Sequence, residues 1–523
     1  MQEGFQKILM ETPDDLEALH GLSDVYARLG DLPIRESEDD VASYRQAREY
    51  YEKAFEGFQK ILEQTPNDLE ALNGLADICA KLGCLLLDMN ALPDVVEQPD
   101  QSSQYKDDYG QAREYLAKAE EGFQKILEET PDDLEALRDL ANVRNRLGDL
   151  SRTEAWLTTW AENKFEEPDF TQAVEFYGKA EEGFQKILEK APADLRTLHN
   201  LSGLRITLGV VSEGKHEYEE AQEYFTKASE GFKKILEREP DSLRALRDLA
   251  DVCERLGEVA RRMDDRSQAQ EYFAKAVEGF ETLLEKAPDN LEALRRLVEV
   301  YEQLGDLAER EADPFKFNYE DDEDDEEYDE DDEEEKPDFT QAREYFAKAL
   351  ETQEKLVELS PNNLEALRDL TDACERLGGL AKKEGDRKQA REYFMKGLEG
   401  FQKIVEQTPD NFRALSFLYR AQSNLGELQE DYEQEKLEYE NALEIARKTL
   451  KRARKDRQAL SDASRYCEEL GRIARKEGDD ERAIRHYKEA LEMREKISKR
   501  TPDNVEMLSA VGDVCFILDE IWK

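Results

Sequence analysis

The sequence offers few side chains arranged for catalysis or for metal binding. Its four histidines, His20, His199, His216 and His486, are scattered without the spacing of a metal site. It contains no P-loop, G-x-G-x-x-G, G-x-S-x-G or H-E-x-x-H motif. Paired carboxylates are plentiful, but among 125 acidic residues they carry no catalytic signal. We therefore expect a protein that is not an enzyme and that uses no metal ion or cofactor.

Apolar side chains that could dock another protein lie in two short stretches. Trp156 and Trp160 are four residues apart, so a helix would place both on one face, next to Leu157. Tryptophan is enriched at the energetic centres of interfaces. Leu86 belongs to a second apolar stretch, 84–96. These residues form a candidate docking patch, and the alternative is that both stretches fold back on their own helices.

These stretches belong to a sequence that repeats itself. The phrase EGFQKILE, a proline, an Asp-Leu or Asn-Leu pair and a Leu-Gly pair return along the whole chain. The steps from Pro192 to Pro240 and from Pro240 to Pro288 are 48 residues each. A fixed period predicts stacked units that share interfaces with their neighbours, in place of one closed core.

Each repeat contains two stretches with helical periodicity. In one repeat, apolar residues recur at helical spacing over 243–259 and again over 269–284, and no segment alternates like a strand. Asp132 followed by Glu135 predicts a capping box at the start of a helix, and the pattern recurs in other repeats. The sequence therefore predicts an all-α fold, an α-α superhelical solenoid of about ten antiparallel helix-hairpin repeats over 1–523.

Small and aromatic residues in these stretches follow a known pattern. Leu256-Gly257, Ala269, Phe273 and Ala276 have the internal spacing of the tetratricopeptide repeat (TPR), and the repeat containing Leu208-Gly209 has it again. The chain resembles a long-helix variant of that family, because 48 residues exceed the usual period of about 34. Each helix would then have about 20 residues. The resemblance implies a protein-binding scaffold in which the first helix of each hairpin lines a concave face.

One slot on those first helices is mostly acidic. It lies five residues before the Leu of each Leu-Gly pair, and the candidate binding residues that occupy it are Asp77, Asn142, Asp251, Glu299 and Asp372. An acidic groove would suit a basic peptide or a basic protein surface. The family's clamp for C-terminal carboxylates is not expected, because the neighbours of Asn142 do not supply its cations.

Four insertions interrupt the period, at 31–43, 84–108, 149–169 and 306–338. Each falls in the turn inside a hairpin, so all should emerge on one edge, which is often the binding face of a repeat protein. Neutral drift is the alternative, since long surface loops cost little stability. Within the last insertion, 318–336 is almost wholly acidic and is predicted to be a disordered loop. The C-terminal repeats, 427–523, diverge from the rest.

The overall charge excludes several classes of partner. With 74 basic and 125 acidic residues, the net charge is −51, which repels nucleic acid and anionic membranes and favours basic partners. No apolar run of about 18 residues could span a bilayer, and the N-terminus lacks the features of a secretory signal. We expect a cytoplasmic protein of bacterial type.

Five cysteines occupy one slot, three residues before the recurring Leu. Cys79, Cys253, Cys374, Cys467 and Cys515 therefore recur in different repeats. Distant repeats of a solenoid do not touch, so most of these cysteines cannot pair with one another. We expect small, buried, reduced side chains.

Three functional hypotheses follow. The favoured one is a non-catalytic scaffold or adaptor that binds partner proteins through the acidic concave face and the apolar edge insertions. A second is a regulatory subunit or substrate of an associated effector, such as a bacterial peptidase system. A third is an acidic decoy that blocks a basic or nucleic-acid-binding surface. The first repeat lacks its usual first half, which suggests self-association through the N-terminal end.

Overall fold

A computed structural model describes most of the chain. The described residues are 2–12, 15–36, 41–90, 102–161, 168–312, 337–361, 363–408, 412–428, 432–452, 457–499, 512, 514–518 and 521. The regular elements in these residues are all α-helices, as the helical periodicity predicted. The chain divides into two compact units, Met1–Asp265 and Arg266–Lys523.

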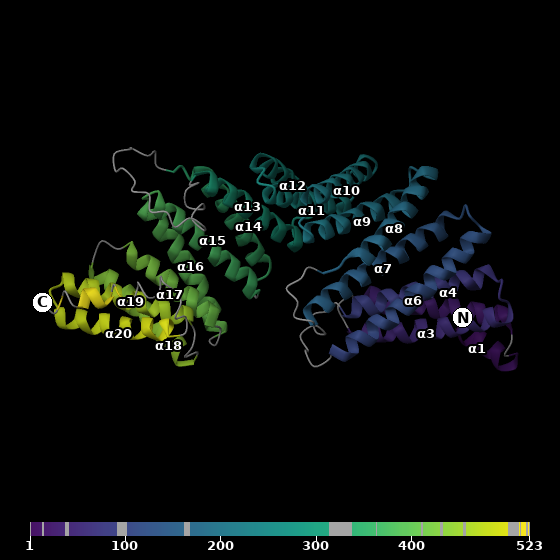
Figure 1. Ribbon diagram of the computed structural model, residues 1–523, viewed down its shortest axis with the longest axis horizontal. Helices are drawn as coiled ribbons and strands as arrows, with labels where there is room; N and C mark the ends of the chain where they lie inside the picture. The colour runs from purple at the N-terminus through teal and green to yellow at the C-terminus, as the bar shows by residue number, and fades with distance from the viewer. Residues whose placement is uncertain are drawn as a thin grey trace. The chain divides into compact units, whose positions relative to one another are not determined.

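Unit 1 is built from helical hairpins (Figure 1). Its helices are α1 (Gln2–Glu11), α2 (Leu16–Glu36), α3 (Val41–Gln64), α4 (Leu69–Asn90), α6 (Ser102–Glu129), α7 (Leu134–Ala161), α8 (Thr171–Lys190), α9 (Leu195–Gly214), α10 (Tyr218–Arg238) and α11 (Leu243–Arg262). Helix α2 packs on α3, α4 on α6, α7 on α8 and α9 on α10. The first helices of successive hairpins also contact one another, as α4 does α7 and α7 does α9. These first helices therefore share one face of the unit.

Unit 2 repeats the same arrangement. Its helices are α12 (Arg266–Lys286), α13 (Leu291–Ala312), α14 (Thr340–Leu359), α15 (Leu364–Lys383), α16 (Arg387–Gln407), α17 (Phe412–Glu427), α18 (Tyr432–Arg452), α19 (Arg457–Lys476) and α20 (Asp480–Ser498). Helix α13 packs on α14, α15 on α16, α17 on α18 and α19 on α20. Helices α9 to α15 have 20 to 22 residues each.

A glycine on the first helix and an aromatic ring on the second set the close approach within a hairpin. A Cβ atom added at Gly209 would lie 2.6 Å from Cε1 of Phe225, and one at Gly148 would lie 2.4 Å from the ring of Tyr177. Both rings are fully buried. The absence of a side chain at these glycines lets the ring fill the groove between the helices. This packing offsets the cost of glycine in a helix, which is about 1 kcal/mol relative to alanine.

The helix caps lie one residue later than the sequence suggested. Asp133, the residue before α7, accepts hydrogen bonds through Oδ1 from the amides of Glu135 (3.0 Å) and Ala136 (3.1 Å). Asn363 does the same before α15. The predicted capping box between Asp132 and Glu135 is therefore wrong, because Glu135 is the second helical residue and its amide is itself capped.

Replacing the two candidate caps separately tests this assignment. We expect Asp133→Ala to lower the free energy of unfolding of unit 1 by about 1 kcal/mol, because two amides of the first turn lose their acceptor. Asp132→Ala removes only an exposed ion pair with Lys190 and should cost less. Denaturant unfolding followed by circular dichroism gives both values. A larger loss for Asp132→Ala would contradict the cap at Asp133.

The predicted insertions begin as continuations of helices. Helix α4 extends to Asn90 and α7 to Ala161, so 84–90 and 149–161 are helical. Each of the four insertions spans the junction between the two helices of a hairpin, namely α2 and α3, α4 and α6, α7 and α8, and α13 and α14. The predicted acidic loop, 318–336, lies outside the described residues.

The shared cysteine slot is part of the core in four repeats. Cys79, Cys253, Cys374 and Cys467 are buried, and none of the described cysteines forms a disulfide. Cys515 is exposed, so the expectation of burial is wrong for this residue. In the segment 514–518, it is Val514 that faces the core.

Candidate functional site

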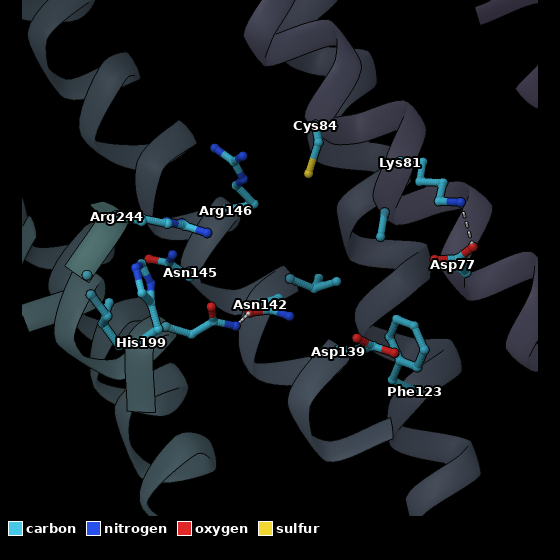
Figure 2. A pocket seen from close by; sticks show the side chains of 15 residues that line it. Asp77, Lys81, Cys84, Phe123, Asp139, Asn142, Asn145, Arg146, His199 and Arg244 are labelled. Carbon is cyan, nitrogen blue, oxygen red and sulfur yellow. Dashed lines mark hydrogen bonds and ion pairs between the residues drawn. The ribbon is translucent and has the colours of Figure 1, made fainter. Parts of the chain in front are cut away.

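The first helices of unit 1 line a groove of about 530 Å³. Figure 2 shows Asp77, Lys81 and Cys84 on α4 opposite Asn142 and Asn145 on α7. Helices α9 and α11 add His199, Asn200, Gly203 and Arg244 to the lining, and Phe123 of α6 also contributes. The structure thus brings together two residues of the predicted slot, Asp77 and Asn142. Because the lining carries charges of both signs, we name it the mixed groove.

Amide groups span the mixed groove. The side-chain nitrogen Nδ2 of Asn200 donates to Oδ1 of Asn142 over 3.0 Å, which joins α9 to α7. The Oδ1 atom of Asn145 is buried and has no hydrogen-bond partner among the described residues. A carboxamide can donate and accept at once, so these groups suit the N–H and C=O groups of a bound polypeptide backbone.

The mixed groove is not predominantly acidic. Lys81, Arg146 and Arg244 line it together with Asp77 and Asp139. Burial, helped by the nearby charge of Asp77, raises the pKa of Asp139 to about 6. In unit 1 these cations therefore largely offset the negative charge of the slot, whereas the sequence predicted an acidic groove.

A second recurring position in the sequence explains why basic side chains line the mixed groove. The residue directly before the Leu of the Leu-Gly pair is basic in several repeats: Arg28, Lys81, Arg146, Arg255 and Arg376. It follows the acidic slot by four residues, so the two positions are neighbours on the helix. The carboxylate of Asp77 lies 3.3 Å from Nζ of Lys81. This second slot is the signal that would have revealed the cationic lining from sequence.

A second groove, in unit 2, is strongly acidic. It has a volume of about 420 Å³ and is lined by α13, α14 and α15. Its carboxylates are Glu299, Glu302, Asp306, Glu365, Asp369 and Asp372, and its cations are Arg295 and Arg376. The structure therefore brings the predicted residues Glu299 and Asp372 together. We name this site the acidic groove.

Burial disfavours the charged form of two carboxylates in the acidic groove. It raises the pKa of Glu302 and of Asp306, although the guanidinium of Arg376 opposes both shifts. Arg376 donates to Oδ1 of Asp306 over 2.8 Å. Outside the lining, Arg296 pairs with Glu299, and Arg368 pairs with Glu365 and Asp369. The six carboxylates still outnumber these four arginines, so an additional cation from a ligand would stabilise the carboxylates in their ionised form.

The remaining predicted residues lie elsewhere. Asp251 is half-buried on α11 and belongs to neither groove. Leu86 is 0% exposed and packs in the core with residues of α6 and α7, so its side chain is not available to a partner.

The aromatic patch is partly covered by its own hairpin. Trp156 and Leu157 on α7 are each 46% exposed. The ring of Trp156 lies 5.9 Å from that of the buried Phe170, which immediately precedes α8. Trp160 lies in the last turn of α7, and its side chain is outside the described residues. About half of the Trp156 ring therefore remains accessible.

Family models match several of these hairpins. Tetratricopeptide repeat models match residues 256–313, 371–399 and 464–497. Models of the Sel1 repeat match 26–57, 209–231 and 328–351. The chain is a tetratricopeptide-type repeat protein. This confirms the family that the Leu-Gly, Ala and Phe spacing indicated, and none of the matching models describes a catalytic domain.

The solved structures that match this TPR protein share little sequence with it. MamA is 17% identical, with 48% of this chain and 94% of MamA covered, at a TM-score of 0.27. BtubC from P. vanneervenii is also 17% identical, with coverage of 54% and 92% and a TM-score of 0.32. YrrB, described as a TPR protein with an unusual peptide-binding site, is 15% identical, with coverage of 54% and 98% and a TM-score of 0.28. No curated protein matches the chain.

None of the helices in the described part of this TPR protein combines the length and apolar character that crossing a bilayer requires.

Proposed function

We propose that this TPR protein is a non-catalytic interaction scaffold that binds a basic segment of a partner protein in the acidic groove. The observation that carries the proposal is the charge of that groove, whose six carboxylates outnumber the two arginines of the lining and the two that pair with it from outside, Arg296 and Arg368. The repeat family supports the scaffold role, since its hairpins present first helices to partners. A lysine- or arginine-rich segment would supply the missing positive charge.

Neutralising two carboxylates of the acidic groove tests the proposal. The probe is a fluorescently labelled, arginine-rich peptide titrated with the full chain and followed by anisotropy. Glu299→Gln with Asp372→Asn should weaken binding roughly 10-fold, because two exposed charge pairs contribute about 1–2 kcal/mol together.

The matched control removes the same charge from another surface of unit 2. Glu278 and Glu285 are exposed on α12 and do not line the acidic groove. Glu278→Gln with Glu285→Gln should leave the affinity nearly unchanged. An equal loss in both double variants would show that overall charge selects the peptide, which would favour the acidic decoy over the scaffold.

The salt dependence of the affinity distinguishes binding in the acidic groove from binding at Trp156 and Leu157. Binding through the acidic groove alone should weaken steeply as ionic strength rises, since exposed charges are screened. A partner that also contacts Trp156 and Leu157 would retain affinity at high salt, and Trp156→Ala would remove that remainder. One version of the effector-linked alternative centres on 318–336. Partner binding and regulation that stay intact after deletion of that segment would exclude this version.

A further inference from the structure

Three side chains with metal-binding chemistry meet in unit 2. Cys467 comes from α19, and His486 and Glu489 come from α20, the second helix of the same hairpin. One potential ligand atom of each residue lies within 4.8 Å of the other two. Among the residues that the structure describes, this is the one such group of three, and none of its members lines the acidic groove.

The hairpin geometry explains why the three residues converge. His486 and Glu489 are three residues apart, so they lie on the same face of α20. Cys467 occupies the recurring cysteine slot of α19, which faces the second helix of its hairpin and is 0% exposed. The cluster therefore sits where a thiol, an imidazole and a carboxylate are fixed by two packed helices and not by a mobile loop.

Two observations besides proximity point to a ligand. The Nδ1 atom of His486 is buried and has no hydrogen-bond partner among the described residues, which is costly for a polar atom. Glu489 is oriented by Arg447 of α18, whose Nη2 lies 2.6 Å from both carboxylate oxygens and whose Nε lies 3.1 Å from Oε1. A carboxylate held in this way from a third helix resembles a metal ligand oriented by an outer partner.

We propose that Cys467, His486 and Glu489 bind one zinc ion. Thiolate, imidazole and carboxylate are the ligands that Zn²⁺ takes, at roughly 2.3, 2.0 and 2.1 Å. Small side-chain movements would bring the three ligand atoms to those distances, and water would fill the fourth position. The thiol proton passes to solvent on binding, so the thiolate and the carboxylate, which Arg447 also holds, are the two anionic ligands of the ion. A sulfur ligand selects Zn²⁺ over Mg²⁺ and Ca²⁺.

Metal titration of the full chain tests this site. Zn²⁺ alone is titrated in competition with a chromophoric chelator, and Co²⁺ serves as the spectroscopic probe. We expect one equivalent of Zn²⁺ per chain and, with Co²⁺, a thiolate-to-cobalt charge-transfer band. Cys467→Ser should abolish that band and lower the Zn²⁺ affinity by about 100-fold or more, since loss of outer partners alone costs 10–100-fold.

The recurring slot supplies a matched control. Cys374 occupies the same position on α15 and is also 0% exposed, but no histidine–carboxylate pair accompanies it among the described residues. Cys374→Ser should therefore leave the affinity and the cobalt spectrum unchanged, while it makes the same chemical change in a core. Circular dichroism confirms that both variants remain helical.

Two further variants keep the proposal testable if Cys467→Ser is poorly folded. His486→Gln and Glu489→Gln alter side chains at the margin of the core and should each weaken Zn²⁺ binding at least 10-fold. Cobalt binding without a thiolate band would overturn the proposal, and so would a Zn²⁺ stoichiometry that none of the variants changes.

Discussion

Replacing Gly209 by alanine should destabilise unit 1 by about 1–3 kcal/mol, although alanine is the better helix former. The added methyl group would lie 2.6 Å from Cε1 and 2.8 Å from Cδ1 of Phe225, closer than packed carbon atoms approach. Phe225 is 0% exposed on the buried face of α10, so its ring can make room only by disturbing the packing around it. Denaturant unfolding followed by circular dichroism measures the loss.

Gly203 provides the control within the same helix. A Cβ atom at this position would meet nothing within 4 Å, since Gly203 faces the mixed groove. Gly203→Ala should therefore stabilise α9 by up to about 1 kcal/mol. If both substitutions raised the free energy of unfolding, helix propensity and not the contact with Phe225 would determine the effect of replacing these glycines. Phe225→Leu, added to Gly209→Ala, should recover part of the loss.

Replacing Glu375 by glutamine should stabilise the protein at pH 8 and have little effect at pH 4. Glu375 on α15 is only 10% exposed, and burial, more than the nearby charge of Asp372, raises its pKa to about 7. The guanidinium of Arg420, 3.3 Å away, opposes this shift without cancelling it. One oxygen of the carboxyl group is buried without a hydrogen-bond partner among the described residues.

The direction of the pH effect follows from proton linkage. Between about pH 4.5, the ordinary pKa, and pH 7, the folded state holds a proton that the unfolded state has released. The free energy of unfolding therefore falls as pH rises through this window, and the cost is fully present above it. We expect a difference of about 1–3 kcal/mol between Glu375→Gln and wild type at pH 8.

A second variant on α15 separates burial from the chemical change. Glu365→Gln makes the same change at a side chain that is 66% exposed, where burial adds no comparable cost, so it should not stabilise the protein at pH 8. Thermal unfolding at pH 4, 6 and 8 gives the comparison. If Glu375→Gln were less stable than wild type at pH 8, the ion pair with Arg420 would outweigh the cost of burial.

The fold followed from sequence because its determinants are local. Ala221, Phe225 and Ala228 are all 0% exposed, as the repeat pattern required, and Gly209 meets Phe225 across the hairpin. Small residues and one ring at fixed spacing define the approach of two helices. The sequence analysis placed the helix cap at Asp132, one residue before Asp133. The sequence shows two adjacent carboxylates, and only the backbone geometry shows which of them accepts the hydrogen bonds of the first turn.

The candidate sites were harder to predict from the sequence than the fold, because they depend on contacts between helices. The acidic slot identified Glu299 and Asp372, but the charge of each groove depends on the lysines and arginines four residues further along. Leu86 was selected as a surface residue because its stretch is apolar, yet the same property buries it. Cys467 and His486 are 19 residues apart, a spacing that becomes meaningful only when α19 and α20 pack together.

On the first helices, the residues that line the grooves occupy other positions than the glycines that set the packing of each hairpin. Gly148 packs against Tyr177, whereas Arg146, two residues earlier on the same helix, lines the mixed groove. Under the proposed scaffold role, a substitution at a lining residue would change the surface offered to a partner without altering the contact between Gly148 and Tyr177. Duplication of one such repeat would copy a stable unit, and single changes in its two slots would then give it a new specificity. Under the proposed role, such an array would diversify its partners one position at a time while each hairpin stays folded.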